Sequence, residues 1–190
     1  TWYFAQNFTG EELQYIKKCY PMTGDKPVKK QVRYTLEDPF LRFWFRFIYP
    51  YVSYILQTDP KDAFSQVIKP ELSSYFGLCF ENMCKECLPL LYKSEGVNSA
   101  FQIGEYWSKD CQIDIVGIRK DGWIDICECK WSGSVSCKNI LNDLNTKIKK
   151  YPNKQNATIF RRIFSRKPLK HTSSSVLFKT YSLKDIYGIL

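Results

Sequence analysis

The sequence predicts an α/β fold in which helices flank a mixed β-sheet. Three strand-like segments, 101–107, 112–118 and 123–130, follow one another closely after a long helical pattern. A second helical pattern at 134–151 is followed by another strand-like segment at 157–164. The order helix, three strands, helix, strand supplies a mixed sheet with helices on its faces.

Length and composition narrow the class of protein. A chain of 190 residues has the size of one domain, or of one domain with a small appendage. Its 44% hydrophobic residues exclude disorder, and charged residues interrupt the apolar runs before they reach membrane-spanning length. We therefore expect a soluble, cytoplasmic protein without a membrane partner. We also expect its eight cysteines to be reduced.

Positive charge is concentrated after residue 137. Lys and Arg number 28 against 19 Asp and Glu, which gives a formal net charge of +9. Such an excess favours polyanionic partners such as nucleic acid, although solubility alone also accounts for it. The stretch 138–170 contains ten basic residues and one acidic residue, Asp143. The basic residues are Lys138, Lys147, Lys149, Lys150, Lys154, Arg161, Arg162, Arg166, Lys167 and Lys170.

The N-terminal part is typical of a β-hairpin. Leu13–Tyr20 and Gln31–Leu36 are strand-like, and the polar turn 21–27 joins them. The hairpin resembles the wing of a winged helix. The twelve residues before it are too few for the helices of such a domain.

An aromatic helix follows the hairpin. Asp38 is placed as an N-cap and Pro39 as the first helical residue of a run that ends at Pro50. We expect its aromatic side chains to form part of the core; the alternative is that they stack on nucleic-acid bases. Residues 1–50 are accordingly assigned to a winged-helix remnant and 51–190 to the main domain.

The remaining elements can be placed by their boundaries. The helix at 70–92 begins at Pro70 and is expected to kink or end early at Pro89. Residues 119–122 form a turn between two strands, and 176–181 is the last predicted strand.

Acidic and basic residues form a pattern suited to phosphodiester hydrolysis. Strand alternation places Glu128 and Lys130 on one face, where the carboxylate can hold a metal and the ammonium can contact phosphate or water. Asp114 lies between isoleucines on the preceding strand, and ion pairing with a lysine or arginine is its alternative role. Glu81 lies in the helix on a core-facing stripe, one turn after Gly77, which would allow close approach of a strand or ligand; an exposed or capping role is equally open to it.

Other candidate residues have competing interpretations. Four cysteines, in Cys84-x-x-Cys87 and Cys127-x-Cys129, could bind zinc, but alternation turns the latter pair away from Glu128 and Lys130. Lys147 and Lys150 lie on the helix after the Glu-x-Lys strand. Lys147 either points toward the site or pairs with Asp143. The arginines at 161 and 162 either contact phosphate or lie on a solvated face. We take these two lysines and two arginines as the candidate nucleic-acid-binding residues.

Four blocks of the sequence resemble a known family. They are Asp38-Pro-Phe-Leu-Arg-Phe-Trp-Phe-Arg-Phe, Tyr75-Phe-Gly-Leu-Cys-Phe-Glu81, Gln112-Ile-Asp-Ile-Val and Glu128-Cys-Lys130-Trp. They are similar to the C-terminal domain of the archaeal-type, AAA-like ATPases, a member of the PD-(D/E)xK nuclease superfamily. The resemblance extends from about Tyr34 to the C-terminus.

The resemblance implies a restriction-endonuclease-like fold and a metal-dependent nuclease that acts on DNA, with RNA as the other substrate to consider. It assigns catalysis to Glu81, Asp114, Glu128 and Lys130, with the three carboxylates as ligands of Mg²⁺ or Mn²⁺. The sequence has no G-x-x-x-x-G-K-[ST] motif, so we expect no ATP hydrolysis by this chain and consider a separate ATPase module or other protein as partner. Gln112 stands where relatives more often have an acid, which weakens a second metal position. The alternative function is an inactive module that binds DNA or a protein through its basic surface.

Overall fold

Two compact units make up the chain. The computed structural model describes residues 15–25, 31–132, 136–170 and 178–189. One unit comprises Thr1–Tyr20 and Val28–Tyr75, and the other comprises Pro21–Pro27 and Phe76–Leu190. We expected a boundary at residue 50. The structure extends the first unit to Tyr75, whose hydroxyl donates a hydrogen bond to Pro39 O at 2.8 Å.

The first unit contains the predicted hairpin. Strands β1 (Ile16–Cys19) and β2 (Arg33–Leu36) pair antiparallel, with Ile16 opposite Leu36. The hairpin is therefore confirmed over this shorter span. Residues 13, 14, 26 and 27, which the prediction included, lie outside the described residues.

A run of short helical segments follows. Helix α2 (Pro39–Phe43) begins as predicted, with Pro39 in its first turn and Asp38 Oδ1 accepting the Leu41 N–H at 2.8 Å. It continues into the π-helical η2 (Trp44–Ile48) and the 3₁₀ turn η3 (Tyr49–Tyr51). Three further segments complete the unit: α3 (Val52–Gln57), α4 (Pro60–Ala63) and the π-helical η4 (Phe64–Ile68). The sequence prediction did not include these last three.

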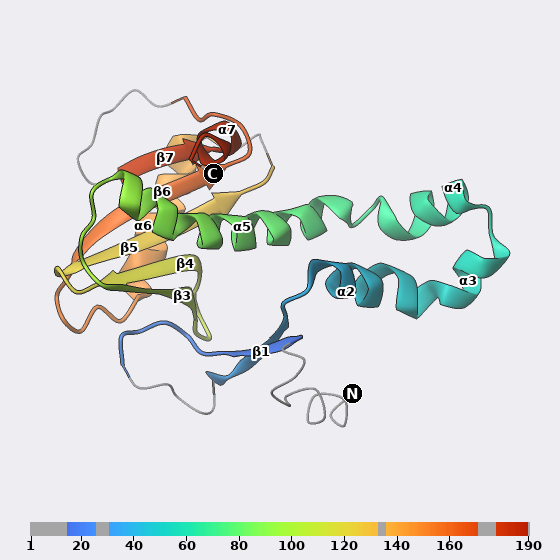
Figure 1. Ribbon diagram of the computed structural model, residues 1–190, viewed down its shortest axis with the longest axis horizontal. Coiled ribbons are helices and arrows are strands. Elements are labelled where there is room, and N and C mark those ends of the chain that lie inside the picture. Colours follow the sequence, from blue (N-terminus) through green and yellow to red (C-terminus); the bar gives the residue numbers. More distant parts are fainter. Residues whose placement is uncertain (1–14, 26–30, 133–135, 171–177, 190) are drawn as a thin grey trace. The chain divides into compact units, whose positions relative to one another are not determined.

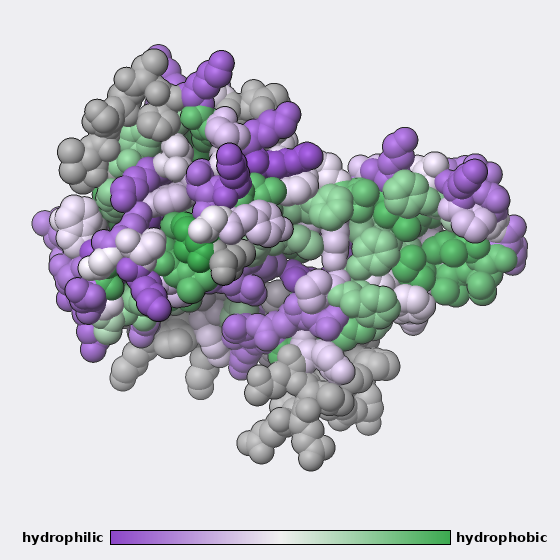
Figure 2. All heavy atoms as spheres, turned by 45° about the horizontal axis from the view of Figure 1, so that its top comes forward, coloured by the Kyte–Doolittle hydropathy of each residue, from purple (hydrophilic) through white to green (hydrophobic). Residues whose placement is uncertain are grey.

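The expectation that the aromatic helix is a buried core element is wrong for most of its rings. Phe47 is buried, and its ring packs edge-on against Tyr75 with centroids 5.5 Å apart. By contrast, Phe40 is 67% exposed and Tyr49 is 65% exposed. The hydrophobic spheres at the right of Figure 2 lie over this segment and the helices that follow it. Aromatic residues recur too often along this helical run for all of them to face one side.

A five-stranded mixed sheet forms the second unit (Figure 1). Its order is β3 (Phe101–Trp107), β4 (Gln112–Arg119), β5 (Trp123–Lys130), β6 (Thr158–Ser165) and β7 (Phe178–Ser182). The first three strands pair antiparallel, and β6 and β7 extend the sheet in parallel. The prediction of an α/β fold with a mixed sheet flanked by helices is confirmed at this level.

Helices cover both faces of this sheet. The long helix α5 (Leu72–Ser94) continues through Pro89 and packs on a core that includes Cys127 and Cys129 of β5. Helix α6 (Cys137–Lys150), capped by Ser136, packs on the core of the opposite face, and the short α7 (Leu183–Tyr187) joins the α5 side. No helix within the described ranges combines the length and apolar character that crossing a bilayer requires.

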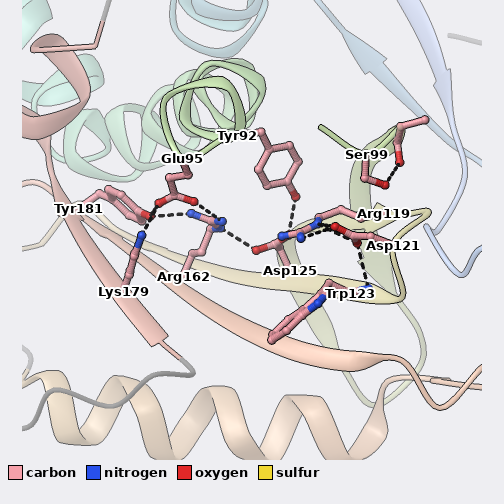
Figure 3. A network of polar contacts seen from close by, with 11 residues as sticks. Tyr92, Glu95, Ser99, Arg119, Asp121, Trp123, Asp125, Arg162, Lys179 and Tyr181 are labelled. Carbon is pink, nitrogen blue, oxygen red and sulfur yellow. Dashed lines mark hydrogen bonds and ion pairs between the residues drawn. The ribbon is translucent and has the colours of Figure 1, made fainter. Parts of the chain in front are cut away.

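A buried polar network fastens the end of α5 to the sheet (Figure 3). Arg162 Nε donates to Asp125 Oδ1 at 2.7 Å, and Arg162 Nη2 donates to Glu95 Oε2 at 2.7 Å. The Tyr92 hydroxyl donates to Asp125 Oδ2 at 2.7 Å. Burial alone would raise the pKa of Glu95, but hydrogen bonds from Arg162, Tyr181 and Lys179 lower it to about 2. These contacts join α5 to strands β5, β6 and β7.

Candidate functional site

Glu128 lies between two lysine ammonium groups at the end of β5. Its side chain is 2% exposed. Lys130 Nζ donates to Oε1 at 2.6 Å, and Lys147 Nζ donates to Oε2 at 2.6 Å. Alternation along β5 brings Glu128 and Lys130 to one face, whereas Lys147 reaches the site from α6. Lys147 thus points toward the site, the first of the two orientations considered for it.

The predicted aspartate lies on the neighbouring strand. Asp114 precedes Ile115, whose partner across the β4–β5 ladder is Cys127. Its Oδ2 accepts the backbone N–H of Cys129 at 2.8 Å. Burial and the negative charge of Glu128 raise the pKa of Asp114 to about 6. The hydrogen bond from Cys129 and the charges of Lys147 and Lys130 act in the opposite direction, Lys147 more strongly than Lys130.

Glu81 belongs to the same electrostatic group. Burial, followed by the negative charges of Asp114, Glu105 and Glu128, raises its pKa to about 7, while Lys130 acts in the lowering direction. The helix α5 therefore brings a third carboxylate close enough to sense the two on the sheet. Burial and neighbouring negative charges both disfavour the ionised form of a carboxylate and so raise its pKa.

Sequence reasoning missed an ion pair that Lys85 forms near Glu81. Lys85 lies one helical turn after Glu81 and donates to Glu105 Oε1 of β3 at 2.5 Å. This pair joins α5 to β3. The i, i+4 spacing of Glu81 and Lys85 would have predicted a pair between those two residues, and nothing in the sequence identifies Glu105 as the partner of Lys85.

An arginine near the end of β5 was also overlooked. The exposed Arg166 donates its backbone N–H to Lys130 O at 3.0 Å. Its guanidinium lies 4.7 Å from the ring centroid of Trp131. Arg166 belongs to the basic stretch, yet only the parallel β5–β6 pairing brings it beside Lys130.

The donor atoms at this site suit a hard divalent cation. They are carboxylate oxygens, and Mg²⁺ is commonly held by one or two carboxylates together with water. Two of the carboxylates, Glu81 and Asp114, also have raised pKa values, first because of burial and then because of acidic neighbours, whose repulsion a cation would relieve. Asp114 and Glu128 are the residues that would hold it. Among the described residues, no three Asp, Glu, Cys or His side chains are grouped closely enough to hold a metal by themselves.

The candidate nucleic-acid-binding residues divide into different environments. Lys150 is exposed and donates to Asp110 O at 3.2 Å, while the half-buried Arg161 donates to Asn145 Oδ1 at 2.8 Å. Arg162 requires a correction because it is 1% exposed and forms part of the buried network. Alternation along β6 turns Arg161 and Arg162 to opposite faces, so neighbouring arginines have unrelated roles.

The two cysteine motifs lie in the core against α5. Cys84, Cys87, Cys127 and Cys129 are all buried there as free thiols. Glu128 contacts α6 on the other face, so alternation turns Cys127 and Cys129 away from Glu128 and Lys130 as predicted. Burial raises the pKa of the Cys127 and Cys129 thiols well above the usual value, which keeps them protonated.

The fold and site define an α/β protein whose mixed sheet carries acidic and lysine side chains at the ends of two central strands. Residues 44–142, just over half of the chain, match a family described as archaeal and bacterial proteins of unknown function. The chain belongs to this family. The matched span contains Glu81, Asp114, Glu128 and Lys130, whereas Lys147 follows it.

One similar protein is an uncharacterized protein of Methanocaldococcus jannaschii. It is 32% identical over 143 residues, which cover 73% of this chain and 31% of the relative. The chain thus spans about a third of that relative's length. No solved structure matches the chain.

Proposed function

We propose that the second unit is a metal-dependent nuclease of the PD-(D/E)xK type that hydrolyses phosphodiester bonds of DNA. The observation that carries the proposal is the buried carboxylate of Glu128 in contact with Lys130, with Asp114 beside it on β4. An acid and a lysine two residues apart on one strand, with a second acid on the neighbouring strand, supply the metal ligands and the positive charge that this chemistry uses.

Each residue has a proposed role. Asp114 and Glu128 hold Mg²⁺ or Mn²⁺, and Glu81 completes the site directly or through water. The ammonium of Lys130 orients the attacking water or contacts the phosphate. When bound, the divalent cation supplies positive charge that stabilises the transition state and favours ionisation of water.

A cleavage assay tests the proposal. The chain is incubated with supercoiled plasmid and with single-stranded DNA in Mg²⁺, in Mn²⁺ and in EDTA. We expect metal-dependent cleavage that falls by at least about 100-fold in Glu128→Gln, which removes a metal ligand, and in Lys130→Met, which removes the ammonium that orients water or contacts the phosphate. Substituting RNA as substrate decides between the two nucleic acids.

The matched control is Glu86→Gln, which removes an exposed carboxylate five residues after Glu81 on the same helix. It should cleave as the unchanged protein does. Cleavage that persists in both Glu128→Gln and Lys130→Met would show that a different site, or a contaminant, is responsible.

A specific observation supports one alternative function. Both carboxylate oxygens of Glu128 accept hydrogen bonds from lysines, so the two ammonium groups already compensate its negative charge. The alternative is a nuclease-like module that binds DNA or a partner protein without cleaving. It predicts DNA affinity that falls steeply with salt and is unchanged by EDTA.

A further inference from the structure

Lys147 contacts a carboxylate oxygen of Glu128 that would have to become free if Glu128 bound a metal through it. The oxygen Oε2 of Glu128 accepts a hydrogen bond from Lys147 Nζ at 2.6 Å, while Oε1 is engaged by Lys130. A cation that bound Glu128 through Oε2 would occupy the same position as this ammonium. Two positive charges in contact with one carboxylate oxygen would repel each other strongly in a partly buried site.

The two lysines differ in how they are attached. Lys130 shares a strand with Glu128 at a separation of two residues, so its ammonium stays beside that carboxylate. Lys147 belongs to α6, which is anchored by the buried Ile140 and Leu144. Both lysine side chains are partly exposed, Lys130 at 30% and Lys147 at 27%, so exposure does not distinguish them. The difference lies in attachment, because the Lys147 ammonium can move into solvent and away from β5 while α6 stays in place.

We propose that Lys147 is a built-in counter-ion that holds Glu128 in the metal-free protein and is released when a divalent cation binds Asp114 and Glu128. This inference rests on the proposed function, because it assigns the competitor of the metal at the same site. Lys147 thus acts through Glu128 and need not touch the reacting phosphate.

Metal affinity measures this competition directly. Mg²⁺ and Mn²⁺ are titrated by calorimetry into the unchanged protein and into Lys147→Gln. Loss of a charge-assisted hydrogen bond that opposes metal binding should tighten the dissociation constant by about ten-fold. In EDTA, Lys147→Gln should unfold at a lower temperature than the unchanged protein, because Glu128 keeps only one cationic partner.

Two variants serve as controls. Lys149→Gln removes the same charge from an exposed position of α6, and it should bind metal as the unchanged protein does. Lys147→Arg keeps a positive charge at the site and should not tighten metal binding. If Lys149→Gln tightened binding as much as Lys147→Gln, the effect would come from net charge and the proposal would be overturned.

A measurement on the unchanged protein avoids dependence on the folding of Lys147→Gln. The ¹⁵N resonance of the Lys147 ammonium is assigned by its loss in Lys147→Arg. Addition of Mg²⁺ should shift this resonance and leave that of Lys149 in place. An unchanged Lys147 resonance at saturating Mg²⁺ would overturn the proposal.

The outcomes separate this inference from the proposed function. Metal binding that is lost in Asp114→Asn but equal in the unchanged protein and Lys147→Gln would overturn the counter-ion role alone. Absence of metal binding in every variant would overturn both. Tighter binding in Lys147→Gln, together with an absence of DNA cleavage, would support the counter-ion role and contradict the nuclease.

Discussion

Gly117 of β4 is placed where a larger side chain would meet Tyr92. A Cβ at this position would lie 2.1 Å from the Tyr92 hydroxyl, which is held by its hydrogen bond to Asp125. We predict that Gly117→Ala lowers the free energy of unfolding by about 2–4 kcal/mol, because it overpacks the core and displaces a partner of a buried carboxylate. Urea unfolding followed by circular dichroism measures the change.

The double variant Gly117→Ala with Tyr92→Phe isolates this clash. Removing the hydroxyl relieves the shortest contact, so the two substitutions together should cost less than the sum of their separate effects. Additive losses would mean that Gly117 and Tyr92 do not interact as the structure indicates.

Glu81 predicts a pH-dependent effect on stability. Its pKa is raised from the ordinary 4.5 to about 7 in the folded protein. The stability that the protonated carboxyl group contributes is therefore fully present below pH 4.5 and is lost as pH rises through 7. In EDTA, the free energy of unfolding of Glu81→Gln should therefore equal that of the unchanged protein near pH 4.5 and be higher by about 1–3 kcal/mol at pH 8. Urea unfolding at the two pH values tests the prediction.

Glu86→Gln is the control for this pH dependence, since it removes an exposed carboxylate from the same helix. Its effect should be small and equal at both pH values. A loss of stability in Glu81→Gln at pH 8 would show that the ionised carboxylate is favourable where it lies.

At the scale of the element, Gly77 lowers the stability of helix α5 at a position where close packing does not require glycine. A Cβ there would meet only the Cβ of Trp131, at 3.9 Å, which is an ordinary contact. We predict that Gly77→Ala raises the free energy of unfolding by about 0.5–1 kcal/mol, because alanine restricts the unfolded chain and favours helix. Thermal and urea unfolding report this gain.

Gly96 provides the matched glycine just beyond the same helix. Its φ of +71° suits glycine, so Gly96→Ala should lower stability by about 1 kcal/mol. Equal effects of the two alanine substitutions would contradict this assignment of their backbone roles.

At the scale of the whole second unit, Arg162 connects elements that are far apart in sequence. It forms ion pairs with Asp125 of β5 and with Glu95 beyond α5. Replacing it by Met would leave the buried Asp125 without this ion pair. We predict that Arg162→Met lowers the free energy of unfolding by about 3–5 kcal/mol in urea titrations.

The adjacent Arg161 offers a direct comparison. Its hydrogen bond to Asn145 lies in a half-buried position, so Arg161→Met should cost no more than about 1 kcal/mol. Similar losses in the two variants would mean that burial of Arg162 does not govern its contribution.

Local patterns predicted most of the second unit. Alternation and turn residues placed β3 and β5 with the bounds that the structure has, and Gly122 adopts the positive φ expected between strands. The same alternation separated Glu128 and Lys130 from Cys127 and Cys129. The segments α3, α4 and η4 were missed because each spans only four to six residues, too few to establish a helical period.

By itself, the sequence determined the strands and the faces of their side chains, because these depend on consecutive backbone geometry. It determined that Glu128 and Lys130 share one face. Only the tertiary structure decided that Lys147 reaches Glu128 from α6, that Arg162 is buried, and that Phe40 and Tyr49 remain exposed. Burial and ion pairing depend on residues that folding brings together from distant parts of the chain, and local spacing carries no record of those partners.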